Sequence, residues 1–155
     1  MPRKSAGILL YRKQNSILEV FLVHPGGPYF INKDEGVWSI PKGEYTDEED
    51  PLAAAKREFE EETGQKVEGN FLPLQTIKQK GGKLVQAWAV EGNIDADTIM
   101  SNTFKMEYPY KSGKWIEVSE IDRGGWFDTH TAITKINAAQ AALVEELVQL
   151  LFNQA

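Results

Sequence analysis

The sequence contains no cysteine and only two histidines among its 155 residues. The absence of cysteine excludes disulfide bonds, thiolate metal sites and cysteine nucleophiles. A chain without thiols suits a reducing compartment, and we expect a cytoplasmic protein.

Long apolar runs are also missing. Gly7–Tyr11 is an apolar run behind the basic residues Arg3 and Lys4, but Arg12 and Lys13 end it too early for the core of a signal peptide. No stretch approaches the roughly 18–20 apolar residues needed to span a bilayer. We therefore expect no membrane partner.

Positive charge is scarcer than negative charge, with 17 lysines and arginines against 23 acidic residues and a formal net charge of −6. The resulting field repels a nucleic-acid polymer, which we do not expect as a partner. A small anionic substrate requires local cations or bound metal ions at one site. The length and the 41% hydrophobic content fit a single domain over residues 1–155. Nothing in the composition indicates an oligomeric state.

The first half of the chain predicts a hairpin, a loop and a helix. Ser5–Arg12 and Ile17–His24 are rich in strand-forming residues and are joined by a polar turn. Residues 25–36 are punctuated by Gly and Pro and predict a loop, which a short strand at Val37–Ile40 follows. Asp50–Thr63 predicts a helix, because Asp50 can cap it, Pro51 suits its first position and Gly64 follows its end. Its core-facing stripe consists of Leu52, Ala55, Phe59 and Thr63.

The second half predicts further strands and one helix. Phe71–Gln79 and Lys83–Val90 flank the Gly81-Gly82 pair and predict a second hairpin. Residues 91–113 form a long connection, and Lys114–Val118 is expected to be the last strand. A C-terminal helix of about 15 residues, capped by Asn137, carries Leu143, Leu147, Leu150 and Leu151. We expect Trp38 and Trp115 in the core. The fold class is α/β (α+β), with a mixed sheet between helices.

Three glutamates of the predicted helix are the main candidates for chemistry. Glu58, Glu61 and Glu62 have i, i+3, i+4 spacing, which puts their carboxylates on one face beside the apolar stripe. Such a run is often only a solvated acidic face. Carboxylate oxygens are also the ligands that Mg²⁺ prefers, and a divalent ion would relieve their repulsion.

The spacing around this helix resembles the Nudix box, G-x5-E-x7-R-E-U-x-E-E-x-G-U, in which U is a bulky apolar residue. The matching positions are Gly43, Glu49, Arg57, Glu58, Phe59, Glu61, Glu62 and Gly64. Only Gln65 departs, because an apolar residue is usual there. The resemblance implies the Nudix fold and a hydrolase that cuts phosphoanhydride bonds.

The resemblance also implies a metal site and the role of each residue in it. Mg²⁺, for which Mn²⁺ can substitute, would be held by Glu58, Glu61, Glu62 and the backbone carbonyl of Gly43. A turn that aims this carbonyl at a metal favours glycine. Arg57 is expected to orient Glu58 or touch phosphate, and to pair with Glu49 to brace the helix.

The substrate is predicted less sharply. The segments Leu22–Gly27 and Trp38–Gly43 resemble the diadenosine polyphosphate hydrolase branch, which implies a nucleoside diphosphate derivative such as diadenosine tetraphosphate. A modified nucleoside triphosphate or a nucleoside diphosphate sugar is the variant. A non-catalytic Nudix-like module that binds a nucleotide is the alternative, but such modules are expected to lose box carboxylates, which this chain keeps.

Substrate contacts are predicted outside the box. Lys42, beside the metal site, can meet a phosphate oxygen or be a solvated loop lysine. Tyr108 and Tyr110 in the long connection can stack on a purine or pack in the loop. His24 can aid phosphate binding, although a histidine at a strand end is often structural.

A separate carboxylate is expected to activate the attacking water, since the box glutamates are occupied by metal. Several Nudix enzymes use a glutamate on a loop downstream of the box. Glu107 is our candidate for this general base or further metal ligand, because it lies in the long connection beside Tyr108. Glu91 and Glu117 are weaker rivals.

Overall fold

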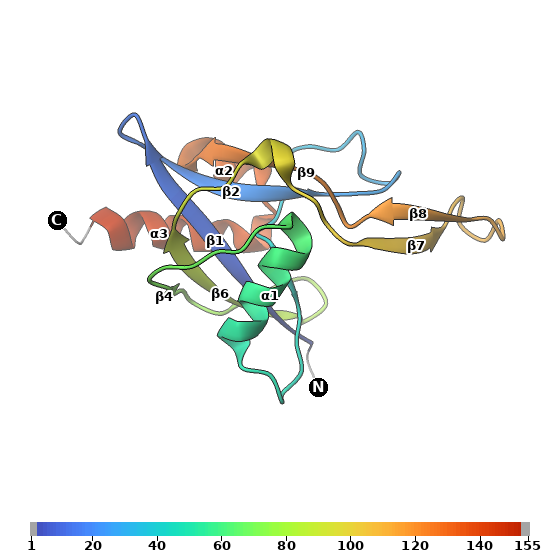
Figure 1. The fold of residues 1–155 in the computed structure, drawn as a ribbon, viewed down its shortest axis with the longest axis horizontal. Coiled ribbons are helices and arrows are strands. Elements are labelled where there is room, and N and C mark those ends of the chain that lie inside the picture. The colour runs from blue at the N-terminus through green and yellow to red at the C-terminus, as the bar shows by residue number, and fades with distance from the viewer. Residues whose placement is uncertain (1–2, 153–155) are drawn as a thin grey trace.

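The computed structural model describes residues 3–152 and consists of a mixed sheet between helices, with a separate hairpin that projects from one end (Figure 1). The strands are β1 Lys4–Gln14, β2 Ile17–Pro25, β3 Lys42–Glu44, β4 Leu72–Pro73, β5 Ile77–Lys78, β6 Leu84–Glu91, β7 Thr103–Glu107, β8 Trp115–Ser119 and β9 Ile121–Asp128. The helices are α1 Pro51–Thr63, α2 Thr129–Lys135 and α3 Ala141–Phe152, with 3₁₀ turns η1 Ala96–Thr98 and η2 Ala138–Gln140.

The main sheet has seven strands in the order β4-β6-β1-β2-β9, with β3 paired to β1 and β5 paired to β6. Only β1 and β6 run parallel in it, and the other pairs are antiparallel. The predicted mixed sheet and the fold class are confirmed.

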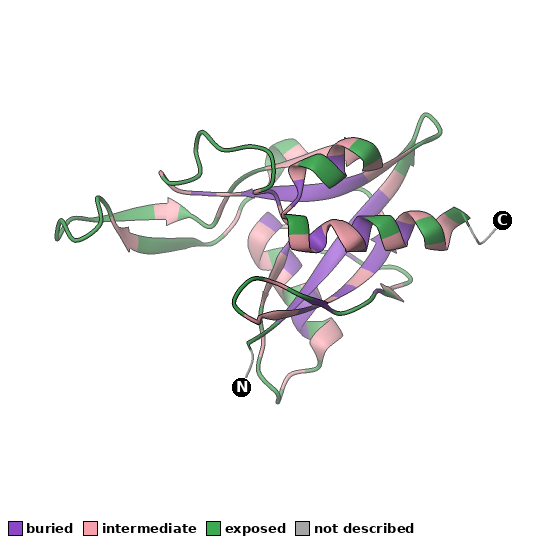
Figure 2. Cartoon of the chain, turned by 180° about the vertical axis from the view of Figure 1, so that it is seen from behind, coloured by how far each residue is buried: buried purple, intermediate pink, exposed green. Residues whose placement is uncertain are grey.

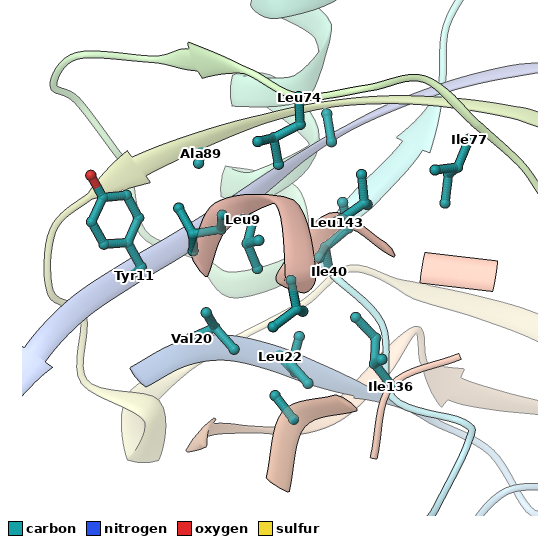
Figure 3. Close-up of a cluster of buried hydrophobic side chains, with 14 of the residues drawn as sticks. Leu9, Tyr11, Val20, Leu22, Ile40, Leu74, Ile77, Ala89, Ile136 and Leu143 are labelled. Carbon is teal, nitrogen blue, oxygen red and sulfur yellow. The ribbon is translucent and has the colours of Figure 1, made fainter. Parts of the chain in front are cut away.

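Both faces of the sheet are covered, which explains why β1 is buried without interruption from Ser5 to Tyr11. Leu9 and Leu22 point to one face, where they pack with Leu143 of α3 (Figure 3). Ala132 of α2 belongs to the same cluster. Ile8 and Phe21 point to the other face, and α1 packs there through Ala55 and Phe59. The sheet thus separates α1 from the C-terminal helices.

Helix α1 begins and ends as its sequence predicts. The Asp50 side chain accepts a hydrogen bond from the Ala53 amide at 2.9 Å, and Pro51 is the first residue of the helix. Gly64 ends it with φ of 77°, a left-handed conformation that favours glycine. The predicted stripe is buried at Ala55, Phe59 and Thr63, while Leu52 is only partly buried.

The end of the sheet differs from the prediction. Lys114–Val118 is not the last strand of the main sheet, because β9 follows it and pairs with β2, and α2 comes next. Gly124 and Gly125 interrupt the strand pattern of β9. A Cβ at Gly124 would lie 2.6 Å from the Phe21 ring, so glycine is required by the packing of that ring. The glycine that interrupts the strand pattern, and so conceals β9 in the sequence, is therefore required by packing in the core.

The predicted connection at 91–113 is not one irregular segment. It contains η1 and β7, and β7 pairs with β8 as a two-stranded hairpin outside the main sheet. This β7–β8 hairpin is largely exposed (Figure 2). It carries Trp115, which is 65% exposed, so the prediction that Trp115 lies in the core was wrong. Trp38, at 4% exposure, is in the core as predicted.

The remaining elements follow the sequence in part. Gly81 and Gly82 have positive φ in the predicted turn, but the strand before them is reduced to β4 and β5. Val37–Ile40 makes only isolated bridges, and Asn137 caps η2 rather than α3 itself. Within residues 3–152, no helix is long and apolar enough to cross a membrane.

Candidate active site on helix α1

Arg57 organises the acidic face of α1. Its Nη2 atom lies 2.9 Å from the carboxylate of Glu49, and its Nη1 atom lies 2.9 Å from Glu58 and 3.3 Å from Glu61. The guanidinium thus spans the loop before the helix and two box carboxylates, a fork geometry that lysine cannot reproduce. The predicted Glu49–Arg57 pair is confirmed.

Glu58 lies against the backbone of β3. A Cβ at Gly43 would come within 2.0 Å of the Glu58 carboxylate, so any other residue there would displace it. Gly43 does not have a positive φ. The need for glycine therefore comes from this close approach, and not from the backbone angles that the sequence suggested. Burial raises the pKa of Glu58, and the negative charge of Glu61 adds to that shift while Arg57 opposes it.

Glu62 is the most strongly perturbed group of the face. Its carboxylate accepts a hydrogen bond from the Lys42 amide at 3.3 Å. Burial nevertheless raises its pKa to about 8, because the bond and the nearby Lys42 charge only partly offset the loss of solvation. Burial also lowers the pKa of Lys42, and the charge of Lys83 lowers it further. The structure thus brings Lys42 and Gly43 to the glutamates of α1.

Glu120, between β8 and β9, is a site residue that the sequence reasoning missed. Glu120 is exposed, but partial desolvation and the charge of Glu61 raise the pKa of its carboxyl, and its own charge acts on Glu58 and Glu62. It therefore lies near the acidic face, and its backbone is linked to that of Glu61 through Asn102. Recognition of a strand at Ile121–Asp128 would have placed Glu120 at the strand's start, beside α1.

Glu107 is engaged within the β7–β8 hairpin. Its carboxylate accepts hydrogen bonds from the amides of Lys111 at 3.0 Å and Gly113 at 2.8 Å, and so it closes the turn of the hairpin. Glu117 accepts a hydrogen bond from the Thr103 hydroxyl at 2.9 Å on the same hairpin, and Glu91 ends β6 beside Tyr11. Glu120, in contrast to these three, carries a charge that raises the pKa values of Glu58 and Glu62.

The predicted base-binding tyrosines lie on the projecting hairpin. Tyr108 is 38% exposed and meets Tyr29 edge to face, with ring centroids 5.5 Å apart. Tyr110 is 75% exposed at the hairpin tip. Both rings are accessible to a ligand, and Tyr29 of the 25–36 loop packs against Tyr108.

His24 is fully buried and both ring nitrogens have protein partners. Nδ1 lies 2.9 Å from an oxygen of Asp122, and Nε2 lies 2.7 Å from the carbonyl oxygen of Lys33. The predicted contact with phosphate would require the ring to leave these partners.

The donor set suits a hard cation, although it is not a finished cage. Within residues 3–152, no three Asp, Glu or His side chains converge closely enough to hold an ion as they stand. Arg57 supplies positive charge between Glu58 and Glu61 instead. The raised pKa values of Glu58 and Glu62 identify carboxylates whose ionised forms are poorly compensated, and hard oxygen donors of this kind fit a divalent ion.

The departure from the box at Gln65 has a local explanation. Its side-chain amide donates hydrogen bonds to the Asp95 carbonyl at 3.1 Å and to the Thr98 hydroxyl at 3.4 Å. These bonds tie the exit of α1 to η1, so a polar contact replaces the usual apolar one away from the acidic face.

Comparison with known proteins agrees with this geometry. Similar solved structures include a C. elegans Ap4A hydrolase binary complex, with 22% identity, coverage of 96% of this chain and 98% of that chain, and a TM-score of 0.68. A mutT/nudix family protein from Listeria innocua has 15% identity, 99% and 97% coverage, and a TM-score of 0.65. The NUDIX domain of Shewanella oneidensis NrtR, complexed with ADP ribose, has 17% identity, 97% and 89% coverage, and a TM-score of 0.65.

These identities establish a shared fold, and the family assignment comes from the sequence. No curated protein matches the chain significantly in sequence. The NUDIX domain family matches residues 1–147, a span that includes β1, the whole of α1 and most of α3. The chain therefore belongs to the NUDIX domain family and is a Nudix hydrolase.

Proposed function

We propose that this Nudix hydrolase is a Mg²⁺-dependent pyrophosphohydrolase that cleaves a phosphoanhydride bond in a nucleoside diphosphate derivative. The observation that carries the proposal is the gathering of Glu58, Glu61 and Glu62 on one face of α1, with Glu120 near enough to act on their pKa values and Gly43 in contact with Glu58. Such a cluster is electrostatically unfavourable without a cation.

The residues divide the work between holding metal and holding substrate. Glu58, Glu61, Glu62 and the Gly43 carbonyl would hold Mg²⁺ or Mn²⁺, which would neutralise phosphate charge and lower the pKa of a bound water. Arg57 keeps Glu58 and Glu61 oriented through its two contacts. With metal on these carboxylates, the guanidinium of Arg57 would be available to phosphate oxygens.

Lys42 and one carboxylate that does not bind metal are the remaining residues of the proposed site. The ammonium of Lys42 is partly buried next to Glu62, where a phosphate oxygen would restore its favourable environment. Glu120 would accept the proton of the attacking water, because it faces the α1 cluster. Glu107 is the alternative base, and it would have to leave the two amides that it now binds.

The organic part of the substrate is proposed from the aromatic side chains. Tyr108 and Tyr110 offer exposed rings on which a purine can stack, and His24 holds the loop that carries Tyr29. A dinucleoside polyphosphate such as diadenosine tetraphosphate is our first candidate, supported by the likeness to the C. elegans Ap4A hydrolase. A modified nucleoside triphosphate is the second.

A panel assay with Mg²⁺ tests this function. Diadenosine polyphosphates, nucleoside triphosphates and nucleoside diphosphate sugars are incubated with the protein, and the released phosphate or pyrophosphate is measured. We expect turnover of at least one substrate that contains a phosphoanhydride. Tight binding of a nucleotide without turnover would instead favour the non-catalytic module, a possibility that the likeness to the NrtR domain keeps in the test.

A further inference from the structure

His24 is bonded from both sides inside the protein. The carbonyl oxygen of Lys33 can only accept a hydrogen bond, so Nε2 of His24 donates to it across 2.7 Å. Nδ1 shares a second hydrogen bond with the carboxyl of Asp122 at 2.9 Å. With its ring fully buried, His24 joins the end of β2 to the 25–36 loop and to β9.

Asp122 lies at an irregularity of the β2–β9 ladder. His24 pairs with Arg123, but the next residue, Pro25, pairs with Ile121, so Asp122 is the extra residue of a bulge. A bulge re-aims a side chain and bends its strand. Here the re-aimed side chain is the one that meets His24.

The residues beyond this bulge are packed tightly against the loop. A Cβ at Gly26 would lie only 2.0 Å from the Ser119 carbonyl oxygen, so the two backbones are in direct contact. The Gly26 amide donates to the Glu120 carbonyl oxygen at 2.9 Å. The segment after His24 therefore fixes the backbone of Glu120 on one side.

The other side of Glu120 is tied to the catalytic helix. Its amide donates to the Asn102 carbonyl at 2.9 Å, and the Asn102 amide donates to the Glu61 carbonyl at 3.1 Å. A continuous series of backbone bonds thus runs from Glu61 through Asn102 and Glu120 to Gly26. Its far end is held by His24 and Asp122.

We propose that His24 is a positioning residue, which holds Asp122 in the bulge and thereby sets the Glu120 carboxylate against the acidic face of α1. The role rests on the proposed function, in which Glu120 takes the proton of the attacking water. Because a misplaced general base lowers the rate of the chemical step rather than substrate binding, the effect of His24 belongs in kcat.

The kinetic test is a double-variant cycle with His24→Phe and Glu120→Gln. We expect His24→Phe to lower kcat by about tenfold and to change KM by less than about twofold. In the Glu120→Gln background, the same substitution should change kcat by less than about twofold, because the group that it positions is already gone. Equal effects of His24→Phe in both backgrounds would overturn the proposal.

Matched variants distinguish loss of the His24–Asp122 hydrogen bond from a general disruption of the structure. Asp122→Asn keeps a hydrogen-bonding group toward His24 and should retain most of the kcat that Asp122→Ala loses. His130, the other histidine of the chain, is exposed on α2, so His130→Phe is the control and should leave kcat unchanged. Equal losses in the two Asp122 variants would contradict the role of the bond.

Amide hydrogen exchange tests the arrangement without reference to activity. In His24→Phe, the amides of Gly26 and Glu120 should exchange at least about tenfold faster, while those of α1 stay unchanged. If the wild-type protein turned over no nucleotide, the proposed function would fail and this measurement would still judge the link from His24 to Glu120. Unchanged exchange at both amides would overturn it.

Discussion

The acidic face of α1 contains the predicted metal-binding residues, and the β7–β8 hairpin contains the predicted base-binding residues. The two regions differ in how firmly the rest of the protein supports them. Behind the glutamates, Phe59 is fully buried and Arg57 ties the face to Glu49. The hairpin has two strands, lies outside the main sheet and is largely exposed (Figure 2). Tyr110 and Trp115 are among its exposed side chains. A two-stranded hairpin has little stability of its own. The chemistry is therefore expected to be rigidly placed and the base contacts to be adjustable.

Removal of divalent metal should have the largest effect, and it acts only on the α1 face. We expect EDTA to abolish turnover and Mg²⁺ or Mn²⁺ to restore it, because Glu58, Glu61 and Glu62 cannot approach an anionic substrate without a cation. Turnover is measured with the best substrate of the panel. Glu61→Gln and Glu62→Gln should each lose most of the metal-dependent activity.

The matched control for this prediction is Glu60→Gln, since Glu60 is exposed on the same helix and makes none of the contacts described above. It should keep near-normal turnover. Undiminished activity in EDTA would show that the assignment of a metal site is wrong.

A comparison of two glutamates then decides which region supplies the base. Glu120 faces the α1 cluster, whereas Glu107 closes the hairpin turn. Loss of a general base costs about 10²–10⁴ in rate, so Glu120→Gln should lower kcat by at least about 10². If Glu107 is instead the base, Glu107→Gln should lower kcat by at least about tenfold. The kcat of both variants is measured at saturating Mg²⁺.

The thermal midpoint of each variant shows whether a loss of kcat reflects loss of the general base or unfolding of the protein. Neither substitution lies in the core, so the thermal midpoint should move little in both variants. If neither variant loses more than about twofold in kcat, both assignments are withdrawn and Glu91 is tested next.

The difference between the two regions also explains what the sequence could predict. The order of Glu58, Glu61 and Glu62 on one helical face follows from local geometry, and so do the cap at Asp50 and the end at Gly64. These features were predicted correctly because each depends on residues within a few positions.

The residues that were placed wrongly or missed depend on distant contacts. Gly124 breaks the pattern of β9 because the Phe21 ring lies against it, and the pairing partner is about a hundred positions away in the chain. Glu120 acquires its place from that strand. The sequence shows only that Trp115 is a large apolar residue, which predicts burial. Its exposure follows from the separation of the hairpin from the main sheet. No local pattern contains this information.

A smaller effect is expected from the hairpin tyrosines. Stacking of a base on an aromatic ring contributes about 1–3 kcal/mol, so Tyr108→Ala should raise KM by about 5- to 150-fold with kcat nearly unchanged. Tyr110→Ala should raise it less if the tip of the hairpin is only partly engaged. Trp115→Ala is a useful control on the opposite strand. A change in kcat without a change in KM would place Tyr108 in the chemistry instead.

The smallest effect concerns the stability of the metal-free protein against pH, and it reports the α1 face alone. The pKa of Glu62 is about 8 in the folded protein against an ordinary value of 4.5, so the folded state keeps its proton after the unfolded state has lost it. The contribution of Glu62 to stability is therefore full below about pH 4.5 and is lost as pH rises toward 8. Glu58 and Glu120 shift in the same direction. In EDTA, the thermal midpoint should fall by a few degrees across this window, and Glu62→Gln should flatten the fall while Glu60→Gln does not. An equal fall in wild type and Glu62→Gln would show that Glu62 is already ionised and compensated in the metal-free protein, which would weaken its place as a ligand whose charge awaits a cation.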